Sequence, residues 1–199
     1  MVEVIGDNGY LGAIPLDYSL FANSEYYSMA MKPQDVVVAL KLLSEGADLC
    51  SYAVLASELG MSASEVHGAI QRLKEGGLVS PEGRRVVRQA LRDFIVSGIA
   101  HVFPAKEGEP ARGMPTAWAA PVFEGMFKSS DDSAPVWAHP RGGSRGPSVT
   151  PLYKSVPEAA SKDPDLYNCL AIVDTIRLGR ARERKAAIEA LDKRILGDG

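Results

Sequence analysis

Apolar residues recur at spacings of three and four along three consecutive stretches in the first half of the chain, residues 33–45, 51–59 and 62–75. This period is typical of helices that turn one face toward a core. The apolar positions are Val36, Val37, Leu40 and Leu43, then Val54, Leu55 and Leu59, then Val66, Ile70 and Leu73. The pattern therefore predicts three short amphipathic helices in a row.

Residues with known cap and turn preferences bound these helices. Pro33 suits a first helical turn, where its missing N–H is not needed, and Gly60 follows the second helix directly. Ser62 stands before the third helix with Glu65 three residues later, which completes a capping box. The glycine pair at 76–77 then ends the third helix.

A short extended stretch and a longer apolar one come next. Residues 78–87 predict a two-stranded hairpin, and Arg84 and Arg85 make its far side basic. A fourth helix is expected over about residues 88–103. Its apolar face is unusually broad, formed by Leu91, Phe94, Ile95, Val96, Ile99, Val102 and Phe103.

Prolines dominate residues 104–157, at positions 104, 110, 115, 121, 135, 140, 147, 151 and 157. Because proline donates no backbone hydrogen bond, we expect neither long helices nor central strands there. Interspersed aromatic residues are too apolar for a free linker. The segment is therefore expected to wrap over the core in an irregular form, with a short helix near 121–128 and a mobile loop tip at 141–146.

The end of the chain is helical again. Asp163 and Pro164 suit the start of a helix, which Gly179 kinks or breaks before a second amphipathic stretch. The apolar positions are Leu166, Leu170, Val173 and Ile176, then Ile188, Leu191 and Ile195. The predicted fold class is mainly α with a small β-hairpin, divided into an N-terminal arm (1–30), a helical domain with the hairpin (31–103), and a proline-rich segment with C-terminal helices (104–199).

Composition narrows the class of protein. The 199 residues are 46% hydrophobic and 24% charged, which is ordinary for a globular chain. No apolar run approaches the roughly 18 residues that span a bilayer, and no secretory signal precedes the body, so a cytoplasmic protein is expected. Net charge is −3, but residues 1–30 carry four acidic and no basic residues. The remaining chain is near neutral, and a locally basic face could still bind a polyanion.

The stretch 51–79, SYAVLASELGMSASEVHGAIQRLKEGGLV, carries the most specific signal. With the hairpin after it, it resembles the helix-turn-helix of winged-helix DNA-binding proteins such as MarR-like bacterial regulators. Ala56 is small where two helices cross, and Gly60 permits the left-handed backbone of a tight turn. The matching residues are Leu55, Ala56, Leu59, Gly60, Met61, Val66 and Ile70. The resemblance covers about residues 33–103.

The resemblance implies a site for double-stranded DNA. The third helix would enter the major groove, where Gln71 would pair with adenine and Ser64 and His67 would donate to base acceptors. Arg72 and Lys74 would contact phosphates beside the helix, and Arg84 and Arg85 would do so from the wing. The implied set is Ser62, Ser64, Glu65, His67, Gln71, Arg72, Lys74, Arg84 and Arg85.

A second basic cluster lies near the C-terminus. Arg177, Arg180 and Arg184 would share one helix face if the helix passed through Gly179. They would then extend the DNA footprint or hold the acidic arm at 1–30. A solvated helix face with local pairing to Glu183 is the alternative.

Signals for catalysis are sparse. Asp131 and Asp132 lack a third ligand, and the histidines, His67, His101 and His139, have no metal-ligand spacing. We expect no enzyme activity, no metal and no cofactor.

The sequence therefore predicts a sequence-specific DNA-binding transcriptional regulator. A homodimer is expected because two recognition helices one helical turn of DNA apart raise both affinity and specificity. Its contact would be formed by the broad apolar face at 88–103, which exceeds what a three-helix core requires, or by the C-terminal helices. The alternative is a protein-interaction module, an adaptor or antitoxin-like partner. A third hypothesis, a regulator with an unknown small-molecule effector, predicts an apolar pocket between the proline-rich segment and the C-terminal helices.

Overall fold

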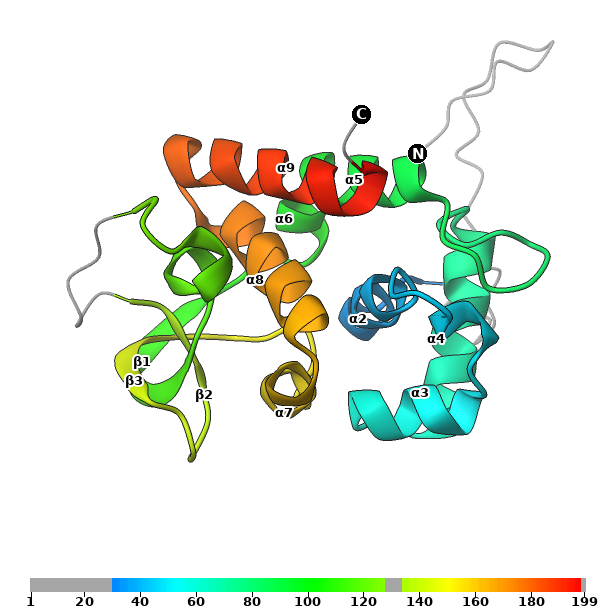
Figure 1. Ribbon diagram of the computed structural model, residues 1–199, viewed down its shortest axis with the longest axis horizontal. Coiled ribbons are helices and arrows are strands. Elements are labelled where there is room, and N and C mark those ends of the chain that lie inside the picture. Colours follow the sequence, from blue (N-terminus) through cyan, green and yellow to red (C-terminus); the bar gives the residue numbers. More distant parts are fainter. Residues whose placement is uncertain (1–29, 128–133, 198–199) are drawn as a thin grey trace, which may run out of the picture. The chain divides into compact units, whose positions relative to one another are not determined.

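Three helices lie within the stretches that the pattern predicts in the first half of the chain, although the first ends at Lys41 and does not continue to 45 (Figure 1). The computed structural model describes residues 30–127 and 134–197, so the predicted arm at 1–30 lies outside the described residues except for Ala30. The elements are α2 (Pro33–Lys41), the 3₁₀ turn η2 (Ala47–Leu49), α3 (Tyr52–Leu59) and α4 (Ala63–Glu75). Both α2 and α3 pack against α4.

Local chemistry explains where α3 and α4 begin. The Ser51 hydroxyl accepts a hydrogen bond from the backbone N–H of Val54 at 3.2 Å. At α4 the predicted capping box is present, because Ser62 N–H donates to the Glu65 carboxylate at 2.8 Å and Glu65 N–H donates to the Ser62 hydroxyl at 3.2 Å. Gly60 between the helices has φ 62°, the left-handed conformation expected of it.

A minimal hairpin follows α4. Val79 and Val86 form a single antiparallel bridge, flanked by a 2.8 Å hydrogen bond from Ser80 N–H to the Arg85 carbonyl. The fourth helix, predicted as continuous, is divided at Gly98 into α5 (Arg88–Ser97) and α6 (Ile99–Val102). Glycine disfavours a helix interior, and Gly98 with φ −109° departs from helical geometry.

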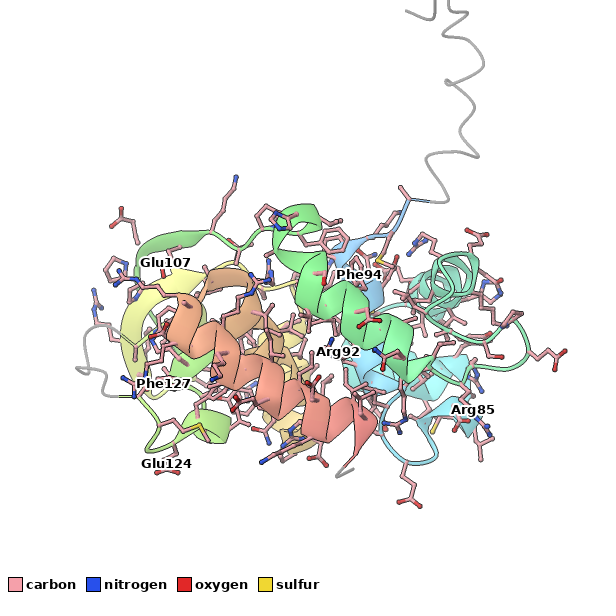
Figure 2. The ribbon with its side chains drawn as sticks, turned by 90° about the horizontal axis from the view of Figure 1, so that it is seen from above. Arg85, Arg92, Phe94, Glu107, Glu124 and Phe127 are labelled. Carbon is pink, nitrogen blue, oxygen red and sulfur yellow. The ribbon has the colours of Figure 1, made fainter. Side chains whose placement is uncertain are left out.

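Part of the broad apolar face of α5 and α6 is covered within the chain. Leu91, Ile95 and Ile99 are fully buried. Helix α9 (Ala181–Leu196) runs along α5, and Arg92 grips Asp192 with two hydrogen bonds of 2.8 and 3.1 Å (Figure 2). Part of the apolar area from which we expected a dimer contact is therefore buried within the chain, whereas Val102 is 53% exposed and Phe94, Val96 and Phe103 are half-buried.

The proline-rich segment contains a small mixed sheet, which contradicts the prediction that it would hold no central strand. Its strands are β1 (Glu107–Pro115), β2 (Val136–Ala138) and β3 (Ser144–Val149). Strand β1 pairs antiparallel with both others, and β2 also pairs with β3 in parallel at Val136 and Ser148. Prolines are tolerated because Pro110 faces Pro147 at a register shift, where regular ladder hydrogen bonds are interrupted.

The segment 141–146, predicted as a mobile loop tip, is instead attached to the sheet. Arg112 Nε of β1 donates to the Gly142 carbonyl at 2.6 Å, and Ser144–Gly146 belongs to the sheet. The helix expected near 121–128 is a single 3₁₀ turn, η4 (Pro121–Phe123), preceded by η3 (Ala117–Ala119).

A buried polar cluster joins the sheet to the C-terminal helices. Asp174 lies on α8 (Pro164–Leu178), which follows α7 (Val156–Lys162). Its carboxylate accepts hydrogen bonds from Trp137 Nε1 at 2.7 Å, Thr116 Oγ1 at 3.1 Å and Arg177 Nη1 at 2.6 Å. These bonds satisfy a charge that is fully buried, and they fix the sheet against α8.

Candidate nucleic-acid interface

Helix α4 presents a polar face to solvent. Ser64, His67 and Gln71 are exposed at spacings of three and four, so they lie on one side of the helix. The opposite side is buried and consists of Val66, Ala69, Ile70 and Leu73. Three of the side chains implicated in base contact are therefore brought together on one accessible face.

Glu65 has a different environment from those three residues. Its carboxylate accepts hydrogen bonds from the Tyr153 hydroxyl at 2.6 Å and from the backbone and hydroxyl of Ser62, both at 2.8 Å. These bonds, that of Tyr153 foremost, lower the pKa of Glu65 from 4.5 to about 2. Ser62 and Glu65 are thus occupied in capping the helix, and the Glu65 carboxylate has internal partners in place of a base.

Arg72 does not have the surface position that was expected of a phosphate contact. Its guanidinium points inward and holds the fully buried Asp35 of α2 through two hydrogen bonds of 2.6 and 2.8 Å. Only 11% of the Arg72 side chain is exposed. The physical reason is that Asp35, buried on the facing helix, needs a charged partner.

The two hairpin arginines have different surroundings. The Arg84 guanidinium lies 5.0 Å from the ring centroid of Tyr52, and the Tyr52 ring in turn packs edge-on against His67 at 5.3 Å. Arg84 therefore links the hairpin to α3 through a cation–π contact and lies near the edge of the α4 face. Arg85 is exposed (Figure 2), while Lys74 Nζ donates to the Pro81 carbonyl in the hairpin turn at 3.1 Å.

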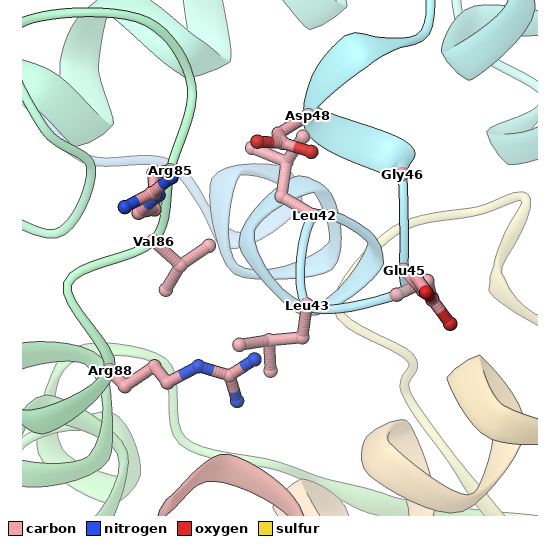
Figure 3. A pocket seen from close by; sticks show the side chains of 9 residues that line it. Leu42, Leu43, Glu45, Gly46, Asp48, Arg85, Val86 and Arg88 are labelled. Atoms are coloured by element: carbon pink, nitrogen blue, oxygen red, sulfur yellow. The ribbon is translucent and has the colours of Figure 1, made fainter.

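A small pocket of about 260 Å³ lies between the hairpin and the loop after α2 (Figure 3). Arg85 and Arg88 line it from the hairpin side, and Glu45 and Asp48 line it from the loop after α2. The Arg88 guanidinium also donates to the Ile195 carbonyl of α9 at 2.6 Å. Because charges of both signs line this pocket, it has no clear preference for an anion such as phosphate.

A lysine that the sequence analysis missed lies at the start of α4. Lys154 is exposed and adjoins Tyr153, whose hydroxyl binds Glu65. Its Nζ is 5.8 Å from the Tyr153 ring centroid. No local pattern could have revealed it, because 88 positions separate Tyr153 from Glu65 in the chain.

The second basic cluster does not form. Helix α8 ends at Leu178 and α9 begins at Ala181, so the three arginines share no helix face. Arg177 is 4% exposed and pairs with Asp174, and Arg184 donates to the Val96 carbonyl at 2.7 Å. Only Arg180 of the three is exposed. Arg177 and Arg184 point inward because buried polar groups need hydrogen-bond partners: Asp174 for Arg177, and a backbone carbonyl for Arg184.

The cavity nearest to the expected effector pocket has about 590 Å³ and is lined by Glu107, Trp118, Leu178, Arg180 and Glu183. It lies between the proline-rich segment and the C-terminal helices, as that hypothesis required. Three of its five lining residues are charged, however, so it is not the apolar pocket that was predicted.

Residues 30–127 and 134–197 contain neither a clustered metal site nor a membrane-spanning helix. No three histidine, cysteine or acidic side chains there are grouped closely enough to hold a metal ion, and Asp131 and Asp132 lie outside these ranges. No helix there combines the length and the apolar composition needed to cross a membrane.

Comparison with family models, curated proteins and solved structures found no match to this chain.

Proposed function

We propose that the chain binds double-stranded DNA sequence-specifically, as a transcriptional regulator of the winged-helix type. The observation that carries this proposal is the exposed face of α4, where Ser64, His67 and Gln71 stand together on a capped helix that packs against α3. A helix held this way can enter a major groove with its first turns against base edges. The amide of Gln71 has the donor and acceptor pair that matches adenine.

Positive charge flanks this face on both sides. Arg85 and Lys74 lie toward the hairpin, and Lys154 lies toward the start of α4. Each would release a counterion from a phosphate on binding, which gives affinity without sequence preference. Arg84 contributes indirectly, because its contact with Tyr52 fixes the hairpin.

The proposal assigns one DNA contact surface to each chain. Helix α9 packs against part of the apolar face at 88–103, while Val102 on that face is 53% exposed, so the expected homodimer stays a prediction. Sedimentation of the free protein and of the complex measures the number of chains per duplex. A dimer on a palindromic site would place two α4 helices about one helical turn of DNA apart.

Fluorescence anisotropy with the full chain tests this function. Duplexes are first selected from random DNA, and the affinity is then measured as a function of salt. Three phosphate contacts per chain predict a slope of log affinity against log salt of about −3. Arg145→Ala, which removes an exposed arginine of β3, serves as the charge-matched control and leaves the slope unchanged. Salt-independent binding, or no selected sequence, contradicts the proposal.

A protein-interaction module is the second candidate, and exposed apolar residues favour it. Leu49 of η2 is 83% exposed and Val54 of α3 is 44% exposed. Exposed apolar side chains that form one contiguous patch are typical of surfaces that receive a protein partner, and Leu49 and Val54 would belong to such a patch. Leu49→Asp with Val54→Asp would leave DNA binding intact and abolish such an association, whereas α4 substitutions would do the reverse.

A further inference from the structure

The segment 153–155 is attached to the turn that joins α3 to α4. The Tyr153 hydroxyl donates to Glu65 at 2.6 Å, and the Ser155 hydroxyl donates to the Leu59 carbonyl at 2.5 Å. A side chain at Gly60 would place its Cβ only 3.0 Å from Cβ of Ser155, so the backbones approach closely at this point. A piece of the proline-rich segment is therefore part of the local structure around the start of α4.

This attachment places a positive charge beside the polar face of α4. Lys154 is exposed between the two anchored residues, and within the described residues it forms no ion pair at 4.0 Å or less. Lys154 Nζ lies 5.8 Å from the ring centroid of Tyr153, whose hydroxyl bonds to Glu65 at 2.6 Å, so its charge is near the start of α4. Glu65 is already bonded to Tyr153 and Ser62, so the ammonium group remains available to an external anion.

We propose that Lys154 contacts a DNA backbone phosphate next to the start of α4, and that Tyr153 is the positioning residue that holds it there through Glu65. This inference rests on the proposed function and extends the DNA-contacting surface beyond residues 33–103. The partner is the same duplex, contacted by three separate segments of the chain: α4, the hairpin and residues 153–154. We name DNA as the partner because the charge of Lys154 adjoins the exposed face of α4, which is the proposed DNA-contacting face.

The first experiment measures the salt dependence of DNA binding by the full chain carrying Lys154→Ala. Loss of one phosphate contact lowers the slope of log affinity against log salt by about 0.9 in magnitude, equally for all sequences. Lys154→Arg retains the charge and keeps the parental slope. Lys106→Ala, which removes an exposed lysine just before β1, is the matched control and also keeps it.

A second experiment separates positioning from mere attachment of the segment. Tyr153→Phe retains the ring and removes the hydroxyl, and we expect it to weaken DNA binding by roughly two- to fivefold, corresponding to a net hydrogen bond of about 0.5–1 kcal/mol. If Tyr153 acts through Lys154, the same substitution has no further effect on affinity in the Lys154→Ala background. Additive losses would assign Tyr153 a structural role only.

The outcomes distinguish this inference from the function on which it rests. If the parent binds DNA and Lys154→Ala retains the parental salt slope, the inference is wrong and the DNA-binding function stands. If the parent binds no DNA in the selection, both fail. Circular dichroism and urea unfolding of each variant establish that any loss of binding occurs in a folded chain.

Discussion

Arg72 of α4 grips the buried carboxylate of Asp35 on α2 with its guanidinium fork, through distances of 2.6 Å from Nη2 to Oδ1 and 2.8 Å from Nε to Oδ2. Asp35 also accepts a 2.7 Å hydrogen bond from the backbone N–H of Lys32. The ion pair thus joins the first turn of α2 to the last turn of α4. Arg72 therefore has a structural role, although it lies on the helix that we propose to contact DNA.

Arg72→Met should therefore lower stability far more than it lowers DNA affinity in the folded chain. Removal of one partner leaves Asp35 charged and buried, which costs about 3 kcal/mol of the free energy of unfolding. Adding Asp35→Asn should restore part of that loss, since no uncompensated charge remains. Urea unfolding of the single and double variants measures both effects, with the exposed Arg85→Met as control. Simple additivity of the two substitutions would contradict the pairing.

Three glycines, two in the loop before β3 and one in β3 itself, offer a test of close packing with an adjacent control. A Cβ at Gly142 would overlap the Gly113 carbonyl carbon, and one at Gly146 would overlap the Ala134 carbonyl oxygen. Gly142→Ala and Gly146→Ala should each destabilise the chain by about 2–3 kcal/mol or more. Gly143→Ala has open space and should change stability by less than about 0.5 kcal/mol. Thermal unfolding followed by circular dichroism ranks the three, and equal effects would refute the sheet packing.

The Tyr153–Glu65 bond predicts a specific pH dependence of stability. A carboxyl whose pKa falls from 4.5 to about 2 on folding stabilises the native state above pH 4.5 and loses that contribution as the pH falls toward 2. Tyr153→Phe removes the largest cause of the shift. The stability difference between parent and variant should therefore be complete at pH 7 and shrink between pH 4.5 and 2.

Urea unfolding at pH 7, 4 and 3 measures this difference. Tyr167→Phe is the matched control, because the Tyr167 hydroxyl donates to the Pro115 carbonyl at 2.7 Å and so bonds to a group that does not titrate. Its effect on stability should be the same at all three values. A Tyr153→Phe effect that is equally constant would show that Glu65 titrates independently of Tyr153.

Gln71 should contribute to base selection and Arg85 to phosphate attraction, and the two effects should be measurable separately. Gln71→Ala removes the proposed adenine contact and should reduce discrimination at one base pair about tenfold, since a good base contact contributes about 1–3 kcal/mol. Arg85→Ala should weaken binding to all sequences alike and flatten the salt dependence by about 0.9. Affinities for a set of singly substituted duplexes decide this. If both variants lose affinity uniformly, α4 does not read bases.

Most of the helical half was predictable because its signals are local. Pro33, Ser62 with Glu65, and Gly60 act on the backbone within a few residues, and the apolar spacing selects the buried face of each helix. The same local reasoning placed Ser64, His67 and Gln71 together on an exposed side. Their common exposure follows from helix geometry once the apolar stripe is buried.

Local reasoning erred where a partner lies far away in the chain. Prolines argued against a sheet, but β1 pairs Pro110 with Pro147 at an irregular point, which no local pattern announces. Positive charge on Arg72 and Arg177 suggested an external anion, but Asp35 and Asp174 are buried opposite them.

By itself, therefore, the chain's pattern of apolar, cap and turn residues determined which helices form and which side of α4 is polar. Tertiary structure alone decided which cations remain available to a ligand, because an arginine's partner depends on what the fold buries beside it. The burial of Asp35 withdrew Arg72 from the surface, and the attachment of Tyr153 to Glu65 brought Lys154 to it. A buried carboxylate must be neutralised by the nearest donor, and which donor is nearest depends on contacts between distant segments.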